Sequence, residues 1–426
     1  MIILYSFTLL TFYFFNLNNY DKVILYIINF YVCFSICLIF FLGNKSKPEI
    51  SLKEIIFIAL ALRLILLLVN PVTSDDYYRY LWDGKVQNEG LNPFQSAPQD
   101  LMTLHDDIIY PKLTYPEIKT IYPPLAQILF FLSFKIFGVN AYGLKIFYLF
   151  FELGIIIFLY KTLKLIKVNT NYIFLYALSP LVIFEFFINA HIDIELLFFL
   201  AASIYFVLKN NSNLPFLFLG LSVMSKIYSL IFFPFYLIYF FKMLRNTKKF
   251  IKGLFLFFIP FLVILFYYSH IIEVFYTMQN YMQHWYFNSL IYQIILYINS
   301  FIGIENHQLT RIILILFFTI FYIIILKSRF TFIQKLYLVS FCYLFFSHTV
   351  HVWYITLLVL FLPACFTYSA LFWSGFIGLV NITVYFYLKQ NLWKDYLPVL
   401  IIEFIILTGL VFLDIRNFKL KKTVET

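Results

Sequence analysis

Charged residues are scarce in this chain of 426 residues: Asp, Glu, Lys and Arg make up 12% of it, and 63% is apolar. A mean hydropathy of +0.88 excludes a soluble globular protein, in which about half of the residues are apolar. Repeated apolar runs of roughly 15 to 28 residues match the thickness of a bilayer core. A β-barrel would show short alternating segments instead. We therefore expect an all-α, polytopic membrane protein.

Glycine, proline and cysteine are also few, with 12, 14 and 4 copies. No Gly/Ser-rich or Pro-rich linker divides the sequence, so we expect residues 1–426 to form a single integral membrane domain. The first 15 residues lack a basic region and an Ala-x-Ala-like cleavage site, which predicts a retained first span. The cysteines lie in apolar runs without metal-ligand spacing and are expected to be small buried side chains: Cys33, Cys37, Cys342 and Cys365.

Basic residues outnumber acidic ones by 31 to 21, and the excess collects at the ends of apolar runs. This distribution indicates membrane orientation and not nucleic-acid binding, because basic loops stay in the cytoplasm. Four basic segments are therefore expected inside: 43–53, 242–252, 327–335 and 419–422. Residues 71–121, which follow the third span, then face outward.

One conflict is left by this topology. The lysines at 161–167 look cytoplasmic, which requires an odd number of crossings between 122 and 160. The run 122–138 is short and contains a lysine, so it either spans the membrane or lies at its interface. The predicted total is about 12 to 14 spans.

Acidic residues are the scarcest charged class, yet 8 of the 21 lie in 71–121, beside only 4 of the 31 basic residues. The loop opens with adjacent carboxylates, Asp75 and Asp76. Such a pair at a helix start can hold a divalent cation, or share a proton so that one pKa rises into the range of a general base. We expect a catalytic loop here. If a cation is held, Mg²⁺ or Mn²⁺ is expected, although no third ligand is evident.

The residue spacing predicts a surface helix over 74–90, capped by Ser74 or Asp75. One apolar stripe, facing lipid or protein, is formed by Tyr77, Tyr80, Leu81 and Gly84. Charged residues close enough to pair fall on another face: Asp76, Arg79 and Asp83. The alternative is that these carboxylates only cap the helix and neutralise the arginine. The Gly-Leu-Asn-Pro-Phe sequence at 90–94 should end the helix in a turn.

Isolated polar residues interrupt later apolar runs, where a charge is costly and marks a functional candidate. Lys226 lies in the middle of the run 214–241, which predicts two short helices that meet at this lysine. The alternative is a lysine that extends to the lipid headgroups. His191 and Asp193 are close enough to act together or to form a helix cap.

Four more polar residues have more than one possible role. His348 and His351 share one helical face and are candidates for ligand contact, a metal pair or an interface. Glu152 and Glu185 lie inside apolar runs. We expect both glutamates to be neutral or hydrogen-bonded packing groups.

The sequence Ser-Asp-Asp-Tyr-Tyr-Arg-Tyr-Leu-Trp-Asp-Gly-Lys-Val at 74–86, with 90–94 after it, resembles the first outer loop of bacterial GT-C-class glycosyltransferases. More narrowly, it resembles the polyprenol-phosphate-mannose-dependent mannosyltransferases. Further motifs follow in the same order as in that family, at 121–127 (Ile-Tyr-Pro-Pro-Leu-Ala-Gln), 189–193 (Asn-Ala-His-Ile-Asp), 225–228 (Ser-Lys-Ile-Tyr) and 351–354 (His-Val-Trp-Tyr). The last departs from the family pattern, with Val352 in place of proline.

The resemblance implies a catalytic base or metal contact at Asp75 or Asp76. Outside the cytoplasm there are no nucleotide sugars, so the sugar must be activated on a lipid phosphate, and the leaving phosphate needs cationic or hydrogen-bonding partners. The expected phosphate contacts are Arg79, Lys226, His191, His351 and His348. The expected substrate-binding residues of the loop and its surroundings are Tyr78, Trp82, Asp83, Asn92, Tyr122, Gln127 and Asp193.

The expected function is therefore the transfer of a hexose, with mannose as the leading candidate, from a polyprenyl-phosphate donor. The acceptor would be a lipid-linked or envelope glycan at the outer face of the plasma membrane, and the reaction a single displacement with inversion. Two other classes are a transporter or flippase for a lipid-linked sugar, and a glycan polymerase or ligase. A transporter predicts charges near the bilayer midplane and an inverted repeat, and a polymerase or ligase typically has its large outer loop late in the chain. Here the polar candidates fall on one face and the longest loop comes early, which favours the transferase.

Overall fold

The computed structural model describes residues 2–14, 17–43, 50–106, 108–244, 247–267, 276–277, 279, 285–301, 303 and 306–424. Throughout this described part the regular structure is helical, and the sole β-type feature is an isolated bridge between Phe287 and Thr349. The prediction of an all-α, polytopic membrane protein is confirmed. Lys45 and Lys47, on which the orientation of the 43–53 loop depends, lie outside the described residues.

The chain groups into two compact units, the first comprising residues 1–15, 48–173 and 183–281 and the second 16–47, 174–182 and 282–426. The first unit contains the helices α1 (Ile2–Phe14), α3 (Leu52–Leu66), α4 (Asp76–Asn88), α5 (Pro124–Phe137), α6 (Ala141–Leu165), α9 (Asp193–Leu208), α10 (Leu214–Ser225), α11 (Phe233–Leu244) and α12 (Thr247–Tyr267). Its 3₁₀ segments are η1 (Pro98–Asp100), η2 (Met102–Leu104), η3 (Tyr110–Lys112), η4 (Thr170–Ile173) and η5 (Ile227–Phe232).

The second unit contains α2 (Asn19–Gly43), α7 (Phe174–Ala177), α14 (Leu290–Phe301), α15 (His307–Lys327), α16 (Phe332–Phe345), η6 (Val352–Ile355), α17 (Thr356–Val359), α18 (Tyr368–Phe376), η7 (Ile377–Asn381), α19 (Ile382–Gln390) and α20 (Leu397–Val424). Helix α8 (Pro180–Phe187) begins in the second unit and continues into the first.

Five helical stretches of the described chain are long and apolar enough to cross a membrane: Asn19–Gly43, Ala141–Leu165, His307–Lys327, Tyr368–Gln390 and Leu397–Lys419. The bent pair Thr170–Ala177 and Pro180–Phe187 would make a sixth span. Other apolar helices have only 10–17 residues, fewer than the roughly 20 that cross a bilayer. Length and composition therefore support fewer spans than the predicted 12 to 14. The run 122–138 contains α5, which is one of these short helices.

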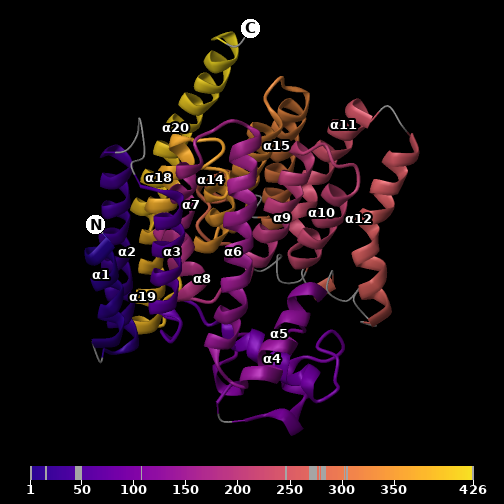
Figure 1. Ribbon diagram of the computed structural model, residues 1–426. Coiled ribbons are helices and arrows are strands. Elements are labelled where there is room, and N and C mark those ends of the chain that lie inside the picture. Colours follow the sequence, from indigo (N-terminus) through magenta and orange to yellow (C-terminus); the bar gives the residue numbers. More distant parts are fainter. Residues whose placement is uncertain are drawn as a thin grey trace. The chain divides into compact units, whose positions relative to one another are not determined.

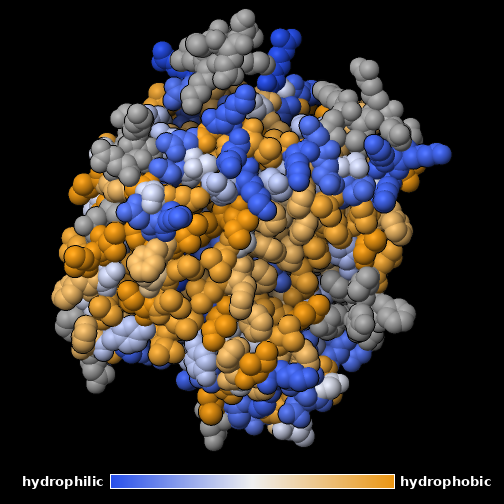
Figure 2. Space-filling view, viewed as in Figure 1, coloured by the Kyte–Doolittle hydropathy of each residue, from blue (hydrophilic) through white to orange (hydrophobic). Residues whose placement is uncertain are grey.

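Helix α4 is the element that carries the aspartate pair. Figure 1 shows α4 and α5 near one end of the long helix α6, and Figure 2 shows hydrophilic side chains over the loop region that surrounds α4. The predicted helix over 74–90 runs from Asp76 to Asn88. At its N-terminus the Ser74 hydroxyl accepts a hydrogen bond from the Asp76 backbone N–H at 3.3 Å. The Asp75 side chain makes no capping bond.

The predicted turn after α4 is confirmed. Gly90 has a φ of +76°, a conformation that glycine adopts without steric cost. This turn lets the Leu91 N–H bond to the Val86 carbonyl oxygen at 3.0 Å, which satisfies a carbonyl of the last helical turn. The predicted helix break at Lys226 is also confirmed, because α10 ends at Ser225 and Lys226 is extended, with φ −158° and ψ 121°.

The predicted apolar stripe of α4 packs on protein. Tyr80 is 1% exposed and stacks on Phe130 of α5, with ring centroids 4.6 Å apart. Gly84 lies so close to α5 that a Cβ atom there would be 2.4 Å from the Phe130 carbonyl oxygen. On its other side α4 packs Trp82 into a small core with Ile109 of the loop. The loop 89–121 is thus folded onto α4.

Candidate functional site

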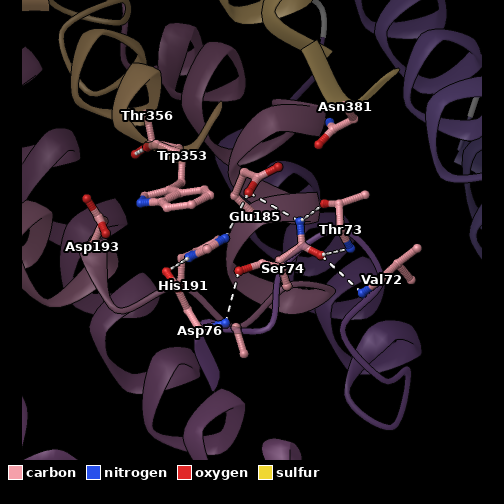
Figure 3. A network of polar contacts seen from close by, with 12 residues as sticks. Val72, Thr73, Ser74, Asp76, Glu185, His191, Asp193, Trp353, Thr356 and Asn381 are labelled. Carbon is pink, nitrogen blue, oxygen red and sulfur yellow. Dashed lines mark hydrogen bonds and ion pairs between the residues drawn. The ribbon is translucent and has the colours of Figure 1, made fainter. Parts of the chain in front are cut away.

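The two adjacent aspartates point to different partners. Asp75 is exposed and accepts a hydrogen bond from the Thr114 hydroxyl, across the loop. The Asp76 side chain is 34% exposed, and its Oδ2 lies 3.7 Å from Nδ1 of the fully buried His191 (Figure 3). Asp75 therefore holds the loop, while Asp76 faces the polar interior of the first unit.

His191 lies between two carboxyl groups. Its Nε2 is 3.5 Å from Oε2 of Glu185 (Figure 3). Glu185 also accepts a hydrogen bond at 3.2 Å from Asn189, whose own side-chain oxygen accepts the backbone N–H groups of residues 72–73 at 3.2 and 3.1 Å. This network fixes the chain directly before Asp76. The expected hydrogen-bonded state of Glu185 is confirmed, but its place beside His191 was not predicted.

Lys226 forms a second charged contact in the same unit. Its Nζ donates to both carboxylate oxygens of Asp193 at 2.7 Å, and the Tyr228 hydroxyl donates to Asp193 at 3.2 Å. Asp193 is the first residue of α9, where the helix dipole favours a negative charge. The Lys226 side chain remains 20% exposed, so the helix break presents an amine that Asp193 holds in place.

Asp76 is the group best suited to proton transfer. The pKa of its carboxyl group is raised to about 7, chiefly by burial and next by the neighbouring Asp75 carboxylate; Asp193 also raises it, whereas Lys226 lowers it. A general base is most effective when its pKa lies near the working pH. The exposed part of the side chain keeps this carboxyl accessible to a substrate.

Arg79 and Asp83 form the predicted ion pair, with Nε 2.9 Å from Oδ1. Arg79 also donates to the Ile118 carbonyl oxygen at 2.8 Å. Asp83 is fully buried, and its Oδ2 accepts from Thr120 at 2.6 Å and from Gln127 at 2.8 Å. The pair therefore ties α4 to the end of the loop and to α5.

The other residues predicted around the loop make mostly internal contacts. The Tyr78 ring lies 4.0 Å from that of Tyr77, measured between centroids. Asn92 accepts the Phe94 backbone N–H at 2.9 Å and so stabilises the turn after α4. Tyr122 packs edge-on against Tyr80, with centroids 4.9 Å apart. Trp82 is 1% exposed and is part of the loop core.

His348 and His351 lie in the second unit, among aromatic rings. His351 stacks on Trp353 with centroids 4.4 Å apart. The pKa of His348 is lowered to about 4, chiefly by burial and in addition by the positive charge of Arg311. His348 is therefore neutral at neutral pH. Its predicted contact with phosphate, like that of His351, stays a prediction.

Two arginines in apolar helices, Arg311 and Arg63, were not predicted as site residues or partners. Arg311 lies four residues into the apolar helix α15, with its guanidinium 5.7 Å from the ring centre of Tyr292. A charge in an apolar run is the signal that could have identified it. The expected hydrogen-bonded state of Glu152 is confirmed, but its partner, the buried Arg63 at 2.5 Å, was not predicted.

A metal site was a second expectation for the aspartate pair. In the part of the chain that the structure describes, no three His, Cys, Asp or Glu side chains are grouped so that they could hold a metal ion. Asp75 and Asp76 also turn toward different partners. Binding of Mg²⁺ or Mn²⁺ therefore stays a prediction.

This fold and site define a multi-pass helical membrane protein with a carboxylate–histidine site at the start of a short helix. Residues 14–242, more than half of the chain, match the family model described as alpha-(1->6)-mannopyranosyltransferase, N-terminal domain. The chain belongs to this family. The predicted resemblance to mannosyltransferases is thus confirmed, and family membership supports a mannosyltransferase activity. No curated protein matches the chain at a significant level.

The family match includes the aspartate pair, His191, Asp193 and Lys226. It ends before His348 and His351, which belong to the part of the chain after residue 242. The residues that the structure brings together in the first unit therefore all lie within the matched region.

Proposed function

We propose that this protein transfers mannose from a polyprenyl-phosphate donor to a lipid-linked or envelope glycan at the outer face of the plasma membrane. Membership of a mannopyranosyltransferase family supports the sugar. The apolar helices and the acidic loop beside them support a donor and an acceptor that meet at a membrane surface. A lipid-phosphate donor fits a compartment without nucleotide sugars.

The observation that carries the proposal is the setting of Asp76, a partly exposed carboxyl with a pKa near 7 beside a buried histidine. Asp76 removes the proton from the acceptor hydroxyl. The acceptor oxygen attacks the anomeric carbon as the bond from that carbon to the phosphate oxygen breaks, and the polyprenyl phosphate leaves with both electrons of that bond. A single displacement of this kind inverts the anomeric configuration.

Asp75 has a different role in this proposal, because it bonds to Thr114 and holds the loop. Lys226, which Asp193 and Tyr228 orient, stabilises the negative charge on the leaving phosphate. His191, held between Asp76 and Glu185, orients the base and is the second candidate for phosphate contact. Arg79 is assigned to the loop and not to the phosphate, since Asp83 and the Ile118 carbonyl oxygen engage it.

The test compares Asp76→Asn with Asp75→Asn in membranes at matched protein levels, using labelled polyprenyl-phosphate mannose. We expect Asp76→Asn to lower transfer by a factor of about 10² to 10⁴, the usual contribution of a general base. Asp75→Asn should lose far less. Glu89→Gln is the matched control, because it removes an exposed carboxylate at the other end of α4.

Near-normal transfer by Asp76→Asn would rule out its role as the base. Release of polyprenyl phosphate is followed in the same assay. A transporter would move the lipid-linked sugar without releasing the phosphate, so mannose transfer without a matching release of lipid phosphate would contradict the proposed chemistry.

A further inference from the structure

Arg79 is placed where it could pair with either of two carboxylates on its own helix. Asp76 precedes it by three residues and Asp83 follows it by four, and both spacings bring side chains together on a helix surface. The structure pairs Arg79 with Asp83, at 2.9 Å. The pairing of Arg79 with Asp83 instead of Asp76 affects the proposed base, because a guanidinium beside Asp76 would stabilise the charged carboxylate and make it a weaker base.

Several contacts keep Arg79 paired with Asp83. Asp83 is fully buried and cannot turn away, since Thr120 and Gln127 donate to its second oxygen. Gln127 is in turn fixed by Gln87, whose side-chain amide donates to its oxygen at 2.8 Å. The far side of the guanidinium donates to the loop carbonyl of Ile118.

Several titratable groups in the described part of the chain act on Asp76. Asp75 lies on its own segment, His191 lies 3.7 Å from it, and Asp193 and Lys226 act on it electrostatically. Tyr80, one helical turn on, also interacts electrostatically with Asp76. Lys226 brings a positive charge to this set, and Asp193 pairs with it at 2.7 Å. The guanidinium of Arg79, which is held on Asp83, is not a member of this set.

We propose that Asp83 is a positioning residue that holds Arg79 away from Asp76 and so keeps the Asp76 carboxylate effective as the base. The inference rests on the proposed role of Asp76. It assigns to Asp83 a role in the chemistry of a group two helical turns away, which Asp83 itself does not touch. It also explains how an arginine can lie three residues from the base without weakening it.

The experiment is the pH profile of kcat/KM for mannose transfer by the full-length protein. In Asp83→Asn the new amide can still accept from Thr120, but it no longer neutralises Arg79. We expect Arg79 to turn to Asp76, so the acid limb of the profile should move to lower pH by about 1 unit or more, the shift an adjacent opposite charge produces. Glu89→Gln, which also removes one negative charge from α4, should leave the limb in place.

Two further variants separate this role from simple structural support. The double variant Arg79→Gln/Asp83→Asn has no guanidinium to approach Asp76, so its limb should return to the wild-type position. Arg79→Gln alone should also leave the limb in place, because in the native protein the arginine is held on Asp83. A purely structural role would lower kcat at every pH, without moving the limb in Asp83→Asn.

The proposal is overturned if the limb of correctly folded Asp83→Asn stays within about 0.3 units of wild type, a change too small for an adjacent charge. If the Asp83→Asn protein does not accumulate in the membrane, the pH profile of Arg79→Gln is measured instead. A limb that moves to higher pH in that variant shows that Arg79 already acts on Asp76, and also overturns the proposal. The role of Asp76 as the base is tested separately, because normal transfer by Asp76→Asn would rule it out.

Discussion

At the scale of single residues, the site depends on the different surroundings of two neighbouring carboxylates. Asp75 and Asp76 have the same chemistry and adjacent positions, yet one is exposed and bonded to Thr114 while the other lies beside a buried histidine. The negative charge of Asp75 also raises the pKa of Asp76, because two like charges so close cannot both ionise easily. Asp75 therefore keeps the proton affinity of its neighbour high, which in the proposed mechanism makes Asp76 a better base.

This relation makes a prediction about pH. Asp76 must be deprotonated to act, so transfer at limiting substrate should rise about tenfold per pH unit below its pKa and level off above about pH 7. Asp75→Asn removes the neighbouring charge, which lowers the pKa of Asp76 and moves the acid limb to lower pH. The measurement is kcat/KM between pH 5 and 9, with Glu89→Gln as control. A limb that does not move in Asp75→Asn, or a rate that falls between pH 6 and 8, contradicts this account.

At the scale of elements, the close packing of α4 on α5 determines where the aspartate pair lies. The two helices approach so closely at Gly84 that a Cβ atom would lie 2.4 Å from the Phe130 carbonyl oxygen and 2.8 Å from Cβ of Phe134. Such a contact to backbone cannot be relieved by a side-chain rotation. The glycine therefore allows Tyr80 and Phe130 to stack, and this packing fixes the orientation of α4.

We expect Gly84→Ala to force α4 away from α5 and to destabilise the protein by about 1 to 3 kcal/mol, the usual cost of overpacking. The thermal unfolding midpoint of the detergent-purified protein measures this effect. Gly409→Ala is the control, because a Cβ atom at that helical position meets nothing within 4 Å; it should be neutral or stabilise by up to about 1 kcal/mol. Equal midpoints for the two variants would contradict the close approach.

The same element shows how far sequence could predict the site. The turn at Gly90, the helix break at Lys226 and the Arg79–Asp83 pair follow from local backbone preferences and helical spacing, and all three were predicted. The contacts of Asp76 with His191, and of His191 with Glu185, depend on how the start of α4 and residues 185–191 meet in the folded unit. No spacing in the sequence encodes that meeting, and Glu185 was therefore expected to be a packing group.

At the scale of the whole molecule, the number of spans was harder to predict than the helical class. Apolar composition alone establishes a membrane protein, but it cannot show where an apolar run breaks. The run 214–241 divides at Lys226, and 170–187 bends by 50° between two short helices. Interrupted helices of this kind are tolerated only where their free backbone groups find partners within the protein. They make hydropathy a better guide to fold class than to crossing number.

The orientation of the first unit gives the last prediction. The acidic loop should face outward and the basic segment 242–252 should face the cytoplasm. Single cysteines are introduced at two exposed positions, Met102→Cys in the loop, where the native side chain is 78% exposed, and Lys252→Cys in α12. A thiol reagent that cannot cross the plasma membrane should label Met102→Cys from outside, but Lys252→Cys only after the membrane is opened. The unmodified protein sets the background from the native cysteines, of which Cys33 and Cys365 are buried. Labelling in the reverse pattern would place Asp76 in the cytoplasm, where nucleotide sugars are available, and would remove the reason for a lipid-phosphate donor.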